Sequence, residues 1–129
     1  MTQLPDDVRD LVLGPNYGHL ATVLPDGSPH TVPVWVAMEG DRIAFLTDPS
    51  SRKGRNVERD PRVAISITQQ DRPNVMAQVR GRVTERLDGD PAWAIIDRMS
   101  QDYLGQPYPL RTDRVIYLIE VDHAWGMAF

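Results

Sequence analysis

The residues best suited to chemistry lie in a short basic stretch at positions 50–62. Arg52, Lys53 and Arg55 fall within one turn of a predicted helix, and Lys53 is the only lysine of the chain. The start of a helix offers free N–H donors and a partial positive charge, to which arginine adds forked donors and lysine a compact cation. The stretch therefore predicts a phosphate site. A solvated surface helix, its arginines paired with nearby carboxylates, is the alternative.

The boundaries of this helix follow from local chemistry. Ser50 or Ser51 is the candidate N-cap, and Asp60-Pro61 ends the helix because a residue before proline avoids the helical region. Strand-like runs at 42–47 and 63–67 flank it on either side. The basic residues are thus expected on a short helix between two strands.

Composition narrows the functional classes. The 129 residues suit one domain, 1–129, with the hydrophobic and charged fractions of an ordinary globular protein, 41% and 25%. The absence of cysteine excludes disulfides, a thiol nucleophile and cysteine–zinc sites, and fits a reducing cytoplasm. No secretion leader or membrane span is expected. A net charge of −4 argues against nucleic-acid binding, so the local positive charge predicts a small anionic ligand.

The alternation of apolar residues predicts a mainly β protein. An antiparallel meander is expected, and Pro33 marks an edge, a bulge or a ligand-facing gap because proline cannot donate to a strand ladder. The apolar end, 122–129, is expected to pair or dock. Two further helices are predicted at 5–13 and 91–104. Six strands of a closed or nearly closed barrel are predicted, at 17–24, 29–38, 42–47, 62–69, 74–85 and 114–121.

Other candidate sites are weaker. His19 and His30 lie on neighbouring predicted strands, but no third ligand stands at metal-binding spacing, so no metal is expected. His123 beside Asp122 is interpreted as a surface pair, and no Ser-His-Asp order indicates a hydrolase.

Aromatic residues could line a pocket for a flat ring. The candidates are Trp35, Tyr103, Tyr108 and Trp125, with core packing as the alternative interpretation for the chain's other aromatics. No residue stands out as an obligate acid or base, and the catalytic residues are left unknown; Tyr103, Tyr108 and His30 are the candidates considered.

An ordered set of segments resembles the pyridoxamine 5′-phosphate oxidase-like split β-barrel flavoproteins. The match runs over about residues 5–122, and its segments are 19–23, 25–29, 32–35, 46–47, 51–57, 60–63 and 79–83. The resemblance implies a six-stranded split barrel and a homodimer with two cofactors at the interface. It also implies that the cofactor phosphate lies on Arg52 and Lys53, in agreement with the charge pattern.

The resemblance extends to the cofactor ring. The strand at 32–35 would lie along the ring through backbone contacts, Asn74 lies near a family glutamine that bonds the ring, and Trp125 resembles a C-terminal aromatic that reaches a cofactor. With the basic stretch, the predicted cofactor-binding residues are Val32, Pro33, Val34, Trp35, Leu46, Thr47, Ser51, Arg52, Lys53, Arg55, Asn56, Asn74 and Trp125.

The chain departs from true pyridoxamine phosphate oxidases. It ends in Trp125-Gly126-Met127-Ala128-Phe129 where they carry an Arg-Leu-x-Pro segment, and it lacks their extended N-terminus, so vitamin B6 oxidation is not expected. It looks more like the actinobacterial branch that uses the deazaflavin coenzyme F-420. The resemblance implies hydride transfer between F-420 and an unidentified small organic substrate. The alternatives are an FMN-dependent oxidoreductase, or a non-catalytic flavin or haem carrier.

Overall fold

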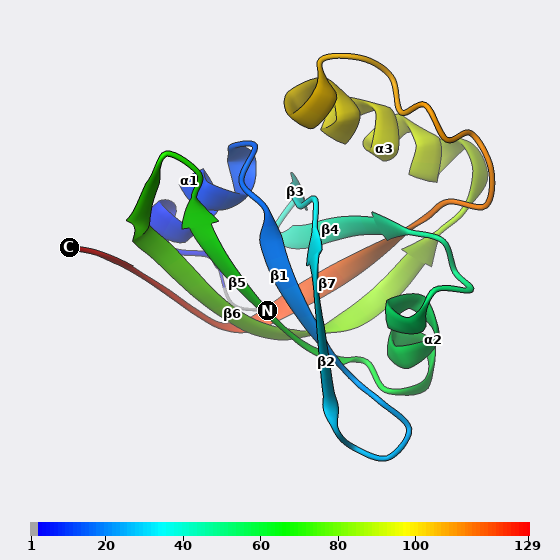
Figure 1. The fold of residues 1–129 in the computed structure, drawn as a ribbon, viewed down its shortest axis with the longest axis horizontal. Helices are drawn as coiled ribbons and strands as arrows, with labels where there is room; N and C mark the ends of the chain where they lie inside the picture. Colours follow the sequence, from blue (N-terminus) through cyan, green and yellow to red (C-terminus); the bar gives the residue numbers. More distant parts are fainter. Residues whose placement is uncertain (1–2) are drawn as a thin grey trace.

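A computed structural model describes residues 3–129, in which three helices accompany one antiparallel sheet (Figure 1). The helices are α1 (Asp6–Leu13), α2 (Arg52–Arg59) and α3 (Gly89–Leu104). The strands are β1 (Gly18–Val23), β2 (Pro29–Val34), β3 (Ala37–Glu39), β4 (Arg42–Thr47), β5 (Arg62–Gln69), β6 (Arg72–Leu87) and β7 (Val115–Ala128). The prediction of a mainly β antiparallel protein is confirmed.

The prediction of six strands in a closed or nearly closed barrel is wrong in its count and in its closure. The described residues form seven strands in the open order β2-β1-β5-β6-β7-β4-β3. The run expected as one strand at 29–38 is divided at Trp35 and Val36, and its two halves lie at opposite edges of the sheet. The prediction that Pro33 marks an edge is confirmed, because it lies on edge strand β2.

The side chain of Tyr103 forms hydrogen bonds with the backbone at this break. The hydroxyl of Tyr103, on α3, accepts from the backbone N–H of Val36 at 3.1 Å and donates to the carbonyl of Asn16 at 2.7 Å. Buried backbone groups need such partners. Tyr103 therefore fixes the point at which the chain leaves β2 and begins β3.

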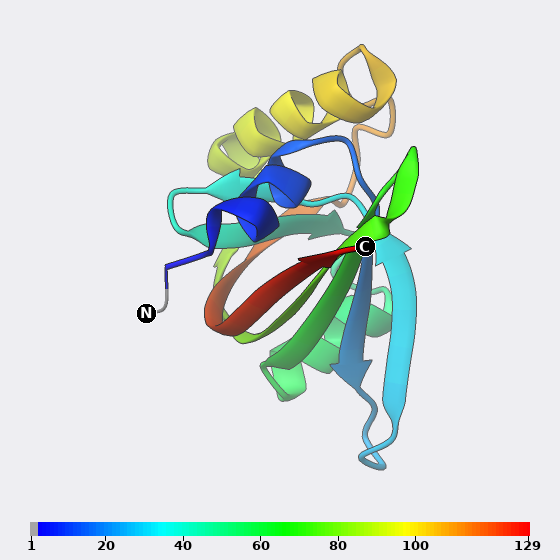
Figure 2. The ribbon, with the colours of Figure 1, turned by 90° about the vertical axis from the view of Figure 1, so that its left-hand side faces the viewer.

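Two apolar cores lie on the two faces of β7. Tyr117 and Ile119 face the core inside the rolled sheet, which α1 covers, whereas Ile116 and Leu118 pack with α3. Because both faces are covered there, the first half of the strand, residues 115–121, is a nearly continuous buried run without alternation. Figure 2 shows α3 lying across the end of the sheet that carries β3 and β4.

The C-terminal end is part of the sheet. β7 continues to Ala128, which pairs with Val75 at the start of β6. The prediction that the apolar end pairs or docks is confirmed. No helix in residues 3–129 is long and apolar enough to cross a membrane.

Candidate cofactor-binding site

A hollow of about 260 Å³ gathers predicted site residues from three separate segments. β2 and the break after it contribute Pro33, Val34 and Trp35, β4 contributes Leu46, and α2 contributes Lys53. Tyr17 and Tyr108 complete its lining. The volume is near the lower end for ligand pockets and matches a ring better than a whole coenzyme.

Lys53 reaches this hollow because the start of α2 is fixed to the end of β4. The Ser51 side chain caps the helix by accepting from the Gly54 N–H at 3.1 Å, and the hydroxyls of Thr47 and Ser51 are 2.8 Å apart. A Cβ at Gly54 would lie 2.9 Å from the carbonyl oxygen of Pro49, so only glycine allows this approach. Of the two predicted caps, Ser50 and Ser51, the structure has Ser51, and the prediction that Asp60-Pro61 ends the helix is confirmed.

The ammonium group of Lys53 is partly removed from water. Burial lowers its pKa, the nearby charge of Arg114 lowers it further, and Asp48 opposes these effects. Hydrogen bonds from the backbone N–H and the hydroxyl of Ser50 lower the pKa of Asp48, so its carboxylate is ionised at neutral pH. Lys53, in the lining of the hollow, thus has a second cation, Arg114, and one carboxylate, Asp48, near it.

The aromatic rings of Tyr17, Trp35 and Tyr108 form another part of the wall. Trp35 stacks on Tyr103, with ring centroids 4.9 Å apart and planes 7° apart, and meets Tyr108 edge-on at 5.7 Å. Tyr17 lies tilted against Tyr103 at 5.7 Å. Such a wall suits a flat heteroaromatic ring and excludes water from one side of it.

Of the three candidate acids and bases, Tyr103, Tyr108 and His30, only Tyr108 lines the hollow. Burial raises the pKa of Tyr103 to about 12, and its hydroxyl is bonded to backbone groups, so Tyr103 does not release a proton near neutral pH. Tyr108 lines the hollow and accepts from Arg114 Nε at 3.4 Å. His30, on β2, does not line it.

The other predicted residues near α2 have different surroundings. Arg52 and Arg55 are exposed on the helix, and Thr47 is buried beneath it. Asn56 is fully buried and donates to the Thr22 hydroxyl at 3.0 Å, which joins α2 to β1. Ser51 acts as the helix cap and Val32 packs against the core, so neither lines the hollow.

Asn74 and Trp125 do not join the hollow within one chain. Asn74 donates to the backbone carbonyl of Phe129, and Trp125 pairs with Gln78 near the end of β7. This end of β7 and α2 lie at opposite ends of the molecule in Figure 1. A cofactor role for either residue stays a prediction.

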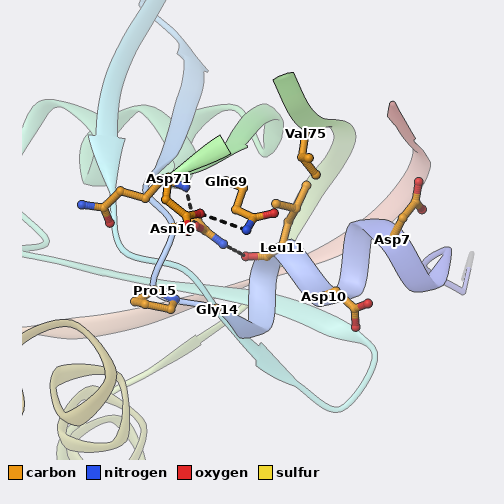
Figure 3. A pocket seen from close by; sticks show the side chains of 10 residues that line it. Asp7, Asp10, Leu11, Gly14, Pro15, Asn16, Gln69, Asp71 and Val75 are labelled. Carbon is orange, nitrogen blue, oxygen red and sulfur yellow. Dashed lines mark hydrogen bonds between the residues drawn. The ribbon is translucent and has the colours of Figure 1, made fainter. Parts of the chain in front are cut away.

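A larger hollow, of about 750 Å³, lies between α1 and the turn that joins β5 to β6 (Figure 3). Its lining carries Asp7, Asp10 and Asp71 and no basic residue. Asn16 braces it by donating to the Leu11 carbonyl and accepting from the Gln70 N–H, both at 2.9 Å (Figure 3). Three carboxylates repel an anion. The smaller hollow that holds Lys53 is therefore the better candidate for an anionic ligand, because of its charge and not its size.

Two contributors to the site were missed from the sequence. Tyr17, which precedes β1, lines the hollow, and Arg114, which immediately precedes β7, donates to the hydroxyl of Tyr108 in that lining. Only the pairing of β4 with β7, in which Thr47 lies opposite Val115, could have indicated that Arg114 lies near the site. In residues 3–129 no three histidine, aspartate or glutamate side chains gather as a metal site.

Comparisons with known proteins show which family the fold resembles. A family model described as pyridoxamine 5′-phosphate oxidase matches residues 4–128. A solved structure described as an F-420 reductase is 33% identical, with a TM-score of 0.81 over 95% of this chain and 98% of that one. Comparison with curated proteins gives no match.

Two more distant structures share the fold. A conserved hypothetical protein from Mycobacterium tuberculosis is 24% identical, with a TM-score of 0.71 over 98% of this chain and 90% of that one. A heme binding protein from Mycobacterium smegmatis is 22% identical, with a TM-score of 0.69 over 98% of this chain and 55% of that one.

Proposed function

Because the chain belongs to the pyridoxamine 5′-phosphate oxidase family, a group of FMN-binding split barrels that includes F-420 reductases, we propose that it is an F-420-dependent oxidoreductase. The observation that carries the proposal is a half-buried lysine, Lys53, in a hollow whose lining also holds the aromatic rings of Trp35 and Tyr108. The 33% identity to an F-420 reductase favours the deazaflavin over FMN. The family model keeps FMN as the alternative.

The residues of the hollow fit such a coenzyme. Lys53 would bind the phosphate, because a partly desolvated ammonium gains most from an anion. β2 is an edge strand of the described sheet, so the backbone groups on its outer side have no strand partner and can bond a heteroaromatic ring. Trp35 and Tyr108 would exclude water from the ring face. When bound, the coenzyme supplies hydride transfer to a small organic substrate.

Absorption and binding measurements test this function. We expect the purified protein to bind F-420 at least about ten-fold more tightly than FMN, and to oxidise reduced F-420 when a quinone, enone or nicotinamide acceptor is present. Tighter binding of FMN would replace F-420 by FMN in the proposal. Tight binding of either coenzyme, with no turnover on any acceptor, would indicate a carrier.

The affinity for the coenzyme should depend on pH through Lys53. Because burial lowers the pKa of Lys53 in the free protein, and a bound phosphate would raise it, the protonated lysine binds better. The affinity should be constant below the free-state pKa and fall as pH rises through it, at a lower pH than for an ordinary lysine. FMN titrations between about pH 7 and pH 10 measure this, since the phosphate itself titrates near pH 6.

Lys53→Arg is the matched control for the pH titration. Arginine keeps its charge over this range, so the variant should bind with little pH dependence. An equal fall of affinity in both proteins would show that Lys53 is not the titrating group.

We also infer that two copies of the chain form the working unit. Trp125 and Met127, on one face of β7, and Phe129, just after its end, are 47%, 44% and 78% exposed. A row of exposed residues on neighbouring strands, each paired with the next, connects this face to the hollow. The row consists of Trp125, Gln78, Ser66, His19 and Pro33. A second copy on this face would cover the apolar stripe and could bring its own Trp125 to the pocket.

Sedimentation equilibrium tests the dimer. We expect a mass of twice the 14.6 kDa of one chain, and a shift toward the monomer when Met127 and Phe129 are both replaced by glutamate. A wild-type monomer at micromolar concentration would contradict the dimer. A cytoplasmic location, based on the absence of cysteine, stays a prediction.

A further inference from the structure

Arg114 is placed next to Tyr108, in the lining of the hollow, and beside the loop before α2 by the pairing of two strands. Thr47 lies opposite Val115, so Arg114, one residue before β7, lies beside Asp48, one residue after β4. Only 18% of its side chain is exposed. A guanidinium is therefore held at the same loop from which α2 begins.

The contacts of Arg114 leave its charge largely unmatched. Its Nη1 lies 3.8 Å from the carboxylate of Asp48 and donates to the carbonyls of Thr112 and Asp113 at 3.1 and 3.2 Å. Its Nε donates to the Tyr108 hydroxyl at 3.4 Å, and Nη2 takes part in none of these contacts. None of these is the paired, fork-like geometry by which arginine binds a carboxylate strongly.

Asp48 is a poor counter-ion for this group. Its Oδ1 already accepts from the backbone N–H and from the hydroxyl of Ser50, each at 2.8 Å. Arg114 and Lys53 are close enough for the charge of one to affect the other, and both act on Asp48, so one carboxylate faces the charge of two cations. Two like charges, both partly removed from water, are unfavourable without a further anion.

We propose that Arg114 and Lys53 together form a two-cation subsite for the phosphate group of the ligand in this hollow. The inference rests on the proposed function and adds to it a residue from the opposite strand. Arg52 and Arg55 are exposed, so water screens their charges, and they contribute less than Arg114. The subsite recognises a phosphate ester, whether the monoester of FMN or the diester of F-420.

Binding of paired ligands with and without phosphate tests the subsite. FMN and riboflavin share a ring and differ by the phosphate, so titrations of both report on that group alone. Arg114→Gln should weaken FMN binding by about 10- to 100-fold and change riboflavin binding by less than about two-fold, as expected for a charge-assisted bond to the phosphate. The same contrast is expected between F-420 and its dephosphorylated deazaflavin riboside.

Arg111→Gln is the matched control. Arg111 lies on the same segment, pairs with Asp97 at 2.6 Å and covers Trp93, outside the hollow. The Arg111→Gln variant should bind FMN with the same dissociation constant as the wild type. If Arg114→Gln does not fold, two other measurements replace it. One is the binding of FMN and riboflavin to Arg114→Lys. The other is the melting temperature, which inorganic phosphate should raise more in the wild type than in Lys53→Met.

The outcomes separate the two proposals. Wild-type protein that binds neither FMN nor F-420 overturns both. Wild-type protein that binds either coenzyme while Arg114→Gln binds it equally well overturns the subsite alone. Equal losses for FMN and riboflavin would also overturn the subsite, because they would show that Arg114 only positions Tyr108.

Discussion

Replacement of Lys53 by methionine is expected to weaken binding of F-420 or FMN by about 1–3 kcal/mol, the range for a hydrogen bond to a charged group. Methionine keeps the length and apolar stem of lysine and removes the charge. The loss is expected because Lys53 is half-buried in the hollow beside Trp35, where an ammonium is less screened than at the surface. Fluorescence titration of each coenzyme measures it.

Arg62→Gln provides the control for Lys53→Met. Arg62 is an exposed arginine just after α2 that pairs with Asp60 at 2.7 Å, outside the hollow. Its replacement should leave the dissociation constants unchanged within about a factor of two, since exposed ion pairs contribute little. If Lys53→Met bound both coenzymes as the wild type does, Lys53 would not be a phosphate anchor.

Replacement of Gly81 by alanine should lower the free energy of unfolding by about 1–3 kcal/mol or more. Gly81 lies on β6 at a register shift with β7, and a Cβ there would lie 2.2 Å from the carbonyl oxygen of Glu120. The obstacle is backbone, so relief requires the two longest strands to move apart. Urea unfolding at a fixed protein concentration measures the loss.

Thr84→Ala tests whether the effect of Gly81→Ala is local. Thr84 is exposed on the same strand, and its replacement should change the free energy of unfolding by no more than about 0.5 kcal/mol. A Gly81→Ala protein as stable as the wild type would show that β6 and β7 can separate at this point without cost.

The sequence predicted the local features of the fold and missed the features set by distant contacts. The N-cap and the end of α2 depend on neighbouring residues, so the end at Asp60 was predicted and the cap was predicted as Ser50 or Ser51. The division of the 29–38 strand depends on the hydroxyl of Tyr103, 67 positions from Val36. No pattern within 29–38 could have shown that partner.

Part of the lining of the hollow was predicted from local sequence. Lys53 and Trp35 were identified from the charge pattern and the resemblance, and both line the hollow. Asn56 was expected at the cofactor, and this role stays a prediction; its bond to Thr22, 34 positions away, could be seen only once the strand order was known. Arg114 was missed for the same reason, since only the pairing of β4 with β7 brings it to Asp48.

A crystal structure of the protein with F-420 or FMN tests the central claim most directly. We predict a phosphate oxygen within hydrogen-bonding distance of Lys53 Nζ, with the ring lying along Pro33, Val34 and Trp35. A coenzyme bound elsewhere, with Lys53 turned into solvent, would contradict the account.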